Sequence, residues 1–194
     1  MAKQKTCPVC KNKWQPFSSM EKVCPTVRCA VKYIEIKNAK AKAKEDKAFR
    51  AETKRLKEMI KPKGKWLKEA QAAFNKFIRL RDKGLPCISC DRKWEATPHL
   101  TGSIFDAGHY RSTGSMATLR FEESNCHAQC VRCNRNLSGN VAEYRIRLVK
   151  RIGEEKLSWL EGPHEPKKYT IEDLKETKAL YSKKAKELEK QIDA

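Results

Sequence analysis

Cys87-Ile-Ser-Cys90 and Cys130-Val-Arg-Cys133 are the two stretches that decide the fold of this chain. In each, two intervening residues separate a pair of thiols, a spacing typical of zinc knuckles. Four thiolates complete a tetrahedral zinc shell and leave no position for water, so this zinc is expected to be structural. The ion would join the chain at Cys90 to the helix that follows Cys133.

A second group of cysteines lies within the first 30 residues and consists of Cys7, Cys10, Cys24 and Cys29. Its spacing predicts another structural zinc site. This zinc finger would either grip DNA through nearby lysines or cap the segment that follows, and the sequence leaves both alternatives open. The ninth cysteine, Cys126, occupies an apolar position and is expected to be a buried thiol.

The composition indicates a polyanionic partner. The chain has 194 residues, with 43 Lys and Arg against 24 Asp and Glu, a net charge of +19. Clustered cations of this kind release counterions when they neutralise phosphates. The sequence has no apolar run long enough to span a bilayer and no signal-like N-terminus, so we expect a reducing cytoplasm, where cysteines bind metals more often than they form disulfides.

The charge is densest in residues 31–68, which hold 14 basic and 5 acidic residues. The start of this segment predicts a solvated helical arm, which Lys61-Pro62-Lys-Gly64-Lys65 should break. The arm is either a grip on the DNA backbone or a charged helix that binds nothing. The residues predicted to contact phosphates are Lys54, Arg55, Lys57, Lys61, Lys63, Lys65 and Lys68.

Apolar periodicity predicts the remaining elements. Residues 66–78 form a helix that Gly84 ends, and residues 103–105 and 118–121 are predicted short strands. Helices follow at 141–152, 154–160 and from Thr170, where Asp173 is placed for a capping interaction. The last helix packs on the body or on a partner helix. We predict an α+β protein divided into residues 1–30, 31–64, 65–163 and 164–194.

The residues between and beside the second cysteine group resemble a nuclease motif. The order His109, Asn125, Asn134 resembles the HNH (ββα-metal) motif, and Cys130-x-x-Cys133-Asn134 is similar to junction resolvases of the phage endonuclease VII type. The match extends to Leu85-Pro-Cys87-Ile-Ser-Cys90, Asp106-Ala-Gly-His-Tyr-Arg111 and Ser138-Gly-Asn140, and it covers nearly the whole chain. On these residues the chain resembles the NinG/Rap family of phage recombination endonucleases.

The resemblance implies a small zinc-stapled ββα-metal core flanked by helices, with the zinc finger on a basic arm. His109 would be the general base, because a neutral imidazole suits that role near pH 7. Asn125 would fix the loop between the strands and orient His109. Asn134 and Asp106 would hold a catalytic Mg²⁺ or Mn²⁺. His127 would complete the ion shell, touch a phosphate or serve the structure. Arg111 would contact a phosphate.

The position of Asp106 raises a geometric condition. Residues three apart in a regular strand face opposite sides, so Asp106 can join His109 only if the strand is bulged, which Gly108 would permit. Glu122 and Glu123 are the alternative carboxylates.

The family implies a phage-encoded enzyme of the bacterial cytoplasm that nicks D-loops and four-way (Holliday) junctions. Other phage recombination proteins are possible partners, and cutting two strands would suit a homodimer. Two rival functions stay open. One is a non-catalytic zinc protein that binds DNA or scaffolds recombination, and the other is a sequence-specific HNH nuclease.

Overall fold

The computed structural model describes residues 3–93 and 105–192. The chain forms two compact units, Met1–Lys61 and Pro62–Ala194. It is a mixed structure of helices and two small sheets, as the α+β prediction required, and it carries two four-cysteine clusters. Among the described residues, no helix combines the length and apolar character needed to cross a membrane.

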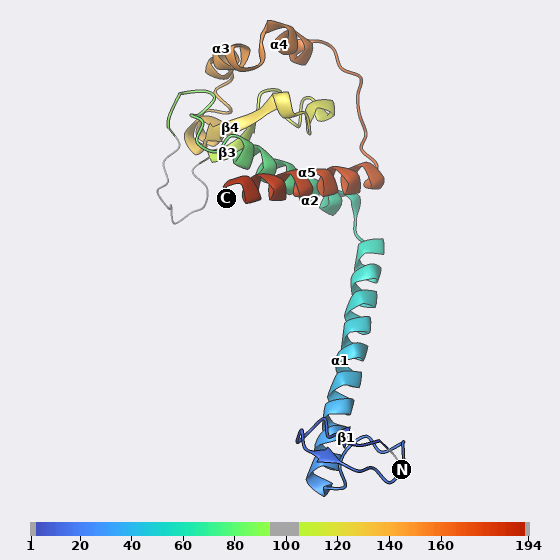
Figure 1. Ribbon diagram of the computed structural model, residues 1–194. Coiled ribbons are helices and arrows are strands. Elements are labelled where there is room, and N and C mark those ends of the chain that lie inside the picture. Colours follow the sequence, from blue (N-terminus) through green and yellow to red (C-terminus); the bar gives the residue numbers. More distant parts are fainter. Residues whose placement is uncertain (1–2, 94–104, 193–194) are drawn as a thin grey trace. The chain divides into compact units, whose positions relative to one another are not determined.

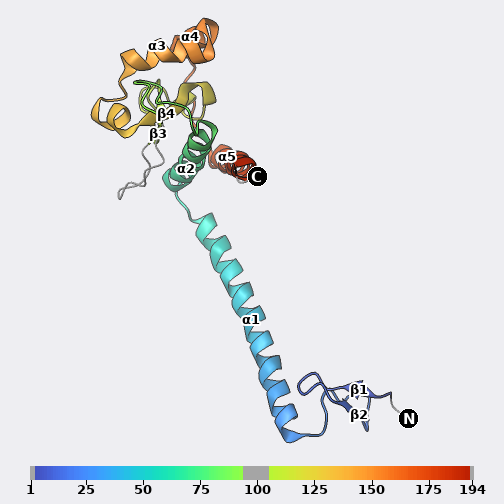
Figure 2. The ribbon, with the colours of Figure 1, turned by 60° about the vertical axis from the view of Figure 1, so that its left-hand side comes forward.

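The N-terminal unit consists of a small hairpin and one long helix. Strands β1 (Lys5–Thr6) and β2 (Lys13–Trp14) pair antiparallel, and α1 runs from Val27 to Met59. Figure 2 shows the hairpin beside the first turns of α1. Ala, Lys and Glu dominate α1 and favour a helix, and Cys29 is its one buried residue. The helix predicted for this charged segment is therefore present.

The second unit opens with α2 (Lys63–Arg81), which begins directly after Pro62. Proline tolerates this place because a helix start leaves its first N–H groups unbonded anyway. Gly64 was expected to loosen the chain, but it lies in the first turn of α2. The predicted arm thus ends earlier than residue 64, and Lys63, Lys65 and Lys68 belong to α2.

Strands β3 (Phe105–His109) and β4 (Cys126–Cys130) form the central antiparallel sheet. Of the predicted strand 103–105, only Phe105 is among the described residues, and it starts β3. The strand predicted at 118–121 is wrong, because Ala117–Leu119 is a 3-10 turn (η1) that buries Leu119 among core side chains. A second short turn, η2 (Glu123–Asn125), leads into β4.

Four helical elements follow the sheet: η3 (Arg132–Asn136), α3 (Val141–Ile152), α4 (Glu154–Glu161) and α5 (Ile171–Ile192). The predicted cap of the last helix is confirmed. Thr170 N–H donates to the Asp173 carboxylate at 2.8 Å, and Asp173 N–H donates to the Thr170 hydroxyl at 3.1 Å. This reciprocal pair satisfies N–H groups that the first helical turn leaves open.

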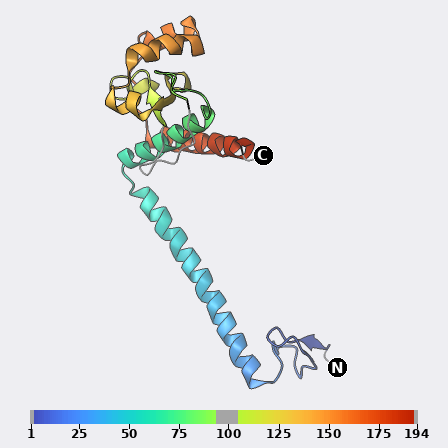
Figure 3. The same cartoon turned by 90° about the vertical axis from the view of Figure 1, so that its left-hand side faces the viewer.

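The second unit is layered around its small sheet. Figures 1 and 3 show α2 and α5 side by side on one side of the sheet, and α3 and α4 on the other. Phe74, Ile78 and Tyr181 form the core on the α2 side. Tyr144 and Leu157, with other buried side chains, form the core on the α3 side. The sheet is thus held between two apolar layers.

Candidate functional site

Two groups of four cysteines form clusters that could hold zinc, as the spacing predicted. In each group the sulfur atoms all lie within 4.8 Å of one another. The members are Cys7, Cys10, Cys24 and Cys29 in one cluster, and Cys87, Cys90, Cys130 and Cys133 in the other. Four thiols at this spacing match the donor set of a structural zinc site.

The thiols of the second cluster are crowded and mostly buried. Burial, and after it the neighbouring thiols, raises the pKa of Cys133 to about 12. A thiolate at this position therefore needs a cation, because metal binding is what drives protons off clustered cysteines. Cys130 lies in β4 and Cys133 in η3, so an ion here would fix the end of the sheet to the turn that follows it.

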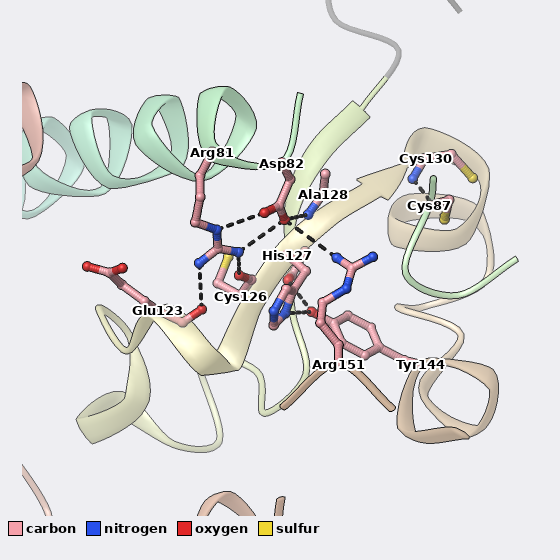
Figure 4. Close-up of polar contacts among 11 residues, drawn as sticks. Arg81, Asp82, Cys87, Glu123, Cys126, His127, Ala128, Cys130, Tyr144 and Arg151 are labelled. Atoms are coloured by element: carbon pink, nitrogen blue, oxygen red, sulfur yellow. Dashed lines mark hydrogen bonds and ion pairs between the residues drawn. The ribbon is translucent and has the colours of Figure 1, made fainter. Parts of the chain in front are cut away.

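The outer edge of β4 is also held by the end of α2 (Figure 4). Asp82 is 2% exposed, and its carboxylate accepts the Ala128 N–H at 2.8 Å. Arg81 donates to the Cys126 carbonyl at 2.8 Å and pairs with Asp82 at 2.7 Å. Ile88 N–H donates to the Ala128 carbonyl at 3.1 Å. These bonds tie the helix and the first knuckle to the strand.

Asp106 and Asn134 meet at the junction between the sheet and η3. The Nδ2 atom of Asn134 lies 3.0 Å from Oδ2 of Asp106, although 28 residues separate them. Arg135 holds the same carboxylate with two bonds, from Nε to Oδ2 at 2.7 Å and from Nη2 to Oδ1 at 2.8 Å. The two residues predicted to share an ion are therefore neighbours.

The turn that carries Asn134 has an unusual form. η3 is a π-helical turn, with Leu137 N–H bonded to the Arg132 carbonyl at 3.0 Å. Such turns are rare and occur often at functional sites. The chain then passes through Ser138, Gly139 and Asn140 with positive φ values of 49°, 88° and 43°. The strained exit and the preceding Cys133 together fix where Asn134 lies.

The donor set at Asp106 suits a hard divalent cation. Burial alone would raise the pKa of Asp106, but the hydrogen bonds from Arg135 and Asn134 hold it below its ordinary value. The carboxylate is therefore ionised at neutral pH. Turning the Asn134 amide would present its oxygen instead of its nitrogen, and carboxylate and amide oxygens are ligands of Mg²⁺ and Mn²⁺. The Arg135 guanidinium already occupies the place of a cation.

His109 lies away from this pair. The β3–β4 register runs from Phe105 to His109 without a skipped residue, so the bulge that Asp106 would need to join His109 is not found. Side chains three apart in such a strand leave opposite faces, and His109 packs against Phe74 of α2 with ring centroids 5.9 Å apart. Nothing in this arrangement brings the imidazole of His109 beside Asp106 and Asn134.

Both ring nitrogens of His109 have neighbours. Nε2 lies 2.9 Å from the Arg120 carbonyl, and Nδ1 lies 3.6 Å from the Cys126 sulfur. Because a carbonyl only accepts, Nε2 carries the proton and Nδ1 holds the lone pair. Burial lowers the pKa of His109, so the ring is neutral at pH 7.

Asn125 holds the loop between the strands. Its Oδ1 atom accepts Arg111 N–H at 2.8 Å, and Nδ2 donates to the carbonyls of Arg111 at 3.0 Å and Leu119 at 3.1 Å. The side chain is fully buried. Its amide binds the backbone at Leu119, next to Arg120, whose carbonyl binds the imidazole of His109. The role predicted for Asn125 in orienting His109 would therefore be indirect.

The other predicted ligands have different partners. His127 is 4% exposed, and its Nδ1 lies 3.3 Å from the Tyr144 hydroxyl (Figure 4), which favours the structural alternative for this residue. Glu122 accepts the Ser124 hydroxyl at 2.6 Å. Glu123 pairs with Lys184. These contacts leave Asp106 as the carboxylate beside Asn134.

Position 108 requires glycine for a reason other than a strand bulge. A Cβ atom built on it would lie 2.1 Å from Oε1 and 2.8 Å from Cβ of Gln129. Gln129 is fully buried and donates to the Ser89 hydroxyl at 2.7 Å and the Gly139 carbonyl at 2.6 Å. Glycine is thus needed because a buried side chain crosses the strand there.

The predicted phosphate contacts fall on different elements. Lys54, Arg55 and Lys57 lie on α1, where Arg55 is paired with Glu52 at 2.8 Å. Arg111 follows β3, and its Nε atom is buried without a hydrogen-bond partner. The phosphate contact expected of Arg111 stays a prediction.

Sequence reasoning missed Arg135 and the Arg81–Asp82 pair. Arg135 directly follows the Cys130-x-x-Cys133-Asn134 motif, and that adjacency was its signal. Asp82 lies four residues beyond Ile78, so it continues the buried stripe of α2. A carboxylate on an apolar stripe signals a buried polar contact.

Comparisons with known proteins place the chain in a family. The family model described as Bacteriophage Lambda NinG protein matches residues 1–191. The chain belongs to the NinG family. Protein ninG of Escherichia phage 933W is 38% identical over 95% of this chain and 94% of its own length. Protein ninG of Escherichia phage lambda is 47% identical over 66% of this chain and 60% of its own length.

The family match confirms the resemblance to NinG proteins and indicates a phage protein. Protein ninG of Salmonella phage P22 is 46% identical over 66% of this chain and 60% of its own length. No solved structure matches the chain. The names of these relatives state no activity, so the HNH classification remains a prediction.

Proposed function

We propose that this NinG protein is a metal-dependent DNA endonuclease that nicks branched recombination intermediates. The observation that carries the proposal is the meeting of Asp106 and Asn134, at 3.0 Å, beside a four-cysteine cluster. A divalent ion held there would stabilise the charge that develops on a cleaved phosphodiester. The net charge of +19 supports DNA as the substrate.

Zinc in this proposal is structural at both four-cysteine clusters. Mg²⁺ or Mn²⁺ is bound separately by Asp106 and Asn134, because oxygen ligands suit these harder ions better than thiolates do. In the second cluster a single peptide bond separates Cys133 from Asn134. Zinc binding there would hold the cation ligand in position.

His109 is the proposed general base, and the ring would have to turn to act. Its neutral state and the proton on Nε2 leave the lone pair on Nδ1, which suits proton abstraction. That nitrogen now lies 3.6 Å from the Cys126 sulfur. The ring would have to leave Cys126 and also pass to the strand face that carries Asp106, so a local rearrangement at the end of β3 is part of the proposal.

The position of His109 also favours one rival function, a non-catalytic protein that binds DNA. Both nitrogens of the His109 ring have neighbours, and the ring lies on the strand face opposite Asp106. A DNA-binding protein without catalytic activity could have the same arrangement. Such a protein would keep both zinc sites and the basic helix. It differs from the nuclease in having no use for a cation at Asp106.

A nicking assay separates the two functions. The substrates are a four-way junction and a linear duplex of matched sequence, each in Mg²⁺ or Mn²⁺. For the nuclease, Asp106→Asn should lower the nicking rate about 100-fold or more, and His109→Ala should lower it about 100-fold. Both variants should still bind the junction.

Asp91→Asn is the matched control. Asp91 is also paired with an arginine, Arg147, at 3.0 Å, and its φ of 56° is one that Asn adopts readily. The control should nick at the wild-type rate. Junction binding without nicking in any metal would favour the non-catalytic function. Equal nicking of both substrates would reject selectivity for branches.

A further inference from the structure

Arg135 grips the carboxylate that the proposed cation needs. Its fork takes both oxygens of Asp106, at 2.7 and 2.8 Å. The Asp106 side chain is 18% exposed, whereas that of Arg135 is 64% exposed. The carboxylate is thus fixed in the protein, while the guanidinium reaches it from the surface and has room to leave.

A divalent ion and the Arg135 guanidinium compete for the carboxylate of Asp106. Oδ2 already accepts hydrogen bonds from Asn134 and Arg135, so an ion bound to it replaces one of them, and an ion bound to Oδ1 lies beside Arg135 Nη2. In either position the two cations repel each other at short range. Arg79 adds further positive charge, since it contributes to the lowered pKa of Asp106. The exposed partner, Arg135, is the one that can turn outward.

A released Arg135 fork would be a strong phosphate ligand. Guanidinium has five N–H donors and no acceptor, and its planar fork matches the oxygens of a phosphate. Because Arg135 adjoins Asn134, its released side chain stays close to the cation ligands. DNA phosphate is the anion that this site would meet under the proposed function.

We propose that a divalent cation displaces Arg135 from Asp106, and that the freed guanidinium then binds a DNA phosphate at the same site. This inference rests on the proposed cation site. It makes Arg135 a positioning residue that couples metal binding to DNA binding. Before the cation binds, Arg135 neutralises Asp106, and afterwards it holds the substrate.

The first test measures cation affinity without DNA. The full-length, zinc-loaded protein is titrated with Mn²⁺, and free Mn²⁺ is followed by electron paramagnetic resonance. Arg135→Gln should bind Mn²⁺ about threefold to tenfold more tightly than wild type, because no guanidinium competes for the carboxylate. Asp106→Asn should lose this Mn²⁺ site.

Arg145→Gln is the matched control for that titration. Arg145 forms the same kind of fork on Glu161, at 2.7 and 3.0 Å, and is 52% exposed. It therefore loses the same charge and the same type of ion pair, on α3. Its Mn²⁺ affinity should stay within about twofold of wild type, since neither Arg145 nor Glu161 touches Asp106.

The second test measures junction binding by fluorescence anisotropy, in EDTA and in Ca²⁺, with the DNA checked for integrity. Without the cation, Arg135→Gln and wild type should bind alike, because Arg135 is held by Asp106. With Ca²⁺, wild type should bind about fivefold more tightly than Arg135→Gln. Asp106→Asn frees the arginine and should bind tightly in EDTA.

The outcomes distinguish this inference from the function on which it rests. Equal Mn²⁺ binding by wild type and Asp106→Asn would remove the cation site and the proposed function with it. Mn²⁺ binding that depends on Asp106 but is unchanged in Arg135→Gln would overturn the displacement alone. An Arg135 effect on DNA binding that is equally large in EDTA would also overturn it.

Discussion

The two four-cysteine clusters begin with the same turn and end in different surroundings. In the first, Lys11 N–H donates to the Cys7 carbonyl at 2.9 Å, and in the second Asp91 N–H donates to the Cys87 carbonyl at 3.1 Å. Lys11 and Asp91 have positive φ values of 64° and 56°. The knuckle is therefore a local structure that a short sequence is able to specify.

The surroundings differ because the remaining ligands come from different elements. The first cluster is completed by Cys29 of α1 and packs against side chains such as Val9 and Trp14. The second is completed by Cys130 of β4 and packs against Phe105 of β3. The first cluster stabilises itself and the start of a helix, whereas the second holds the sheet that carries Asp106.

The largest effect should come from removing one ligand from each cluster. Cys133→Ser should lose one zinc and lower the stability of the second unit by at least about 3 kcal/mol, because the sheet loses its staple. Cys24→Ser should also lose one zinc but leave the unfolding of the second unit unchanged. Zinc content and thermal unfolding followed by circular dichroism measure both. If Cys24→Ser also lost the unfolding transition of the second unit, the stabilities of the two clusters would be coupled.

A smaller effect should come from histidine titration, which can act only in the second unit. Burial lowers the pKa of His127 to about 3, whereas the unfolded chain titrates near 6.5. Below pH 6.5 the unfolded chain binds more protons, so stability falls as the pH falls. Between pH 6.5 and 5 the loss should be about 2 kcal/mol.

Urea unfolding of wild type and His127→Gln at several pH values tests this dependence. The variant should show a flatter profile, because Gln does not titrate. Residues 1–61 contain no histidine, so the N-terminal unit should lack this effect. Parallel profiles for wild type and variant would rule out His127 as the source.

A third prediction concerns the packing around the second cluster. Gly108→Ala should destabilise the second unit by about 1–2 kcal/mol, because the new methyl group displaces Gln129 from its bonds to Ser89 and Gly139. Gly64→Ala is the control, since nothing lies within 4 Å of its Cβ position. It should be neutral or stabilising by a few tenths of a kcal/mol, roughly the preference for Ala in helices. Chemical denaturation measures both.

The smallest effect is expected on α1, near the end of the helix that lies away from Cys29. Under the proposed function, Lys54→Gln should reduce the salt dependence of junction binding by about one ion, as expected for one lost phosphate contact. Arg55→Gln should reduce it less, because Arg55 is already paired with Glu52. Binding measured at several salt concentrations gives the slopes. Equal slopes for both variants and wild type would mean that α1 does not follow the DNA backbone.

The sequence was most informative where structure depends on local spacing. Cysteine spacing located both clusters, and apolar periodicity located α2 and placed the start of α5 within one residue of Ile171. The strand at 118–121 was wrong because Leu119 is buried from a turn and not from a strand, and a short apolar run does not distinguish the two. The family resemblance predicted that Asp106 and Asn134 lie close together. The ion pair of Arg135 was not predicted, because its partner Asp106 lies 29 residues away.

The edge of β4 has a consequence for assembly. A two-stranded sheet normally leaves backbone groups open to a further strand, and such edges invite self-association. Here the groups of Cys126 and Ala128 that face outward are bonded by Arg81, Asp82 and Ile88. A second molecule therefore has no free edge to extend at this strand. Any dimer of this chain would have to form at a surface other than the β4 edge.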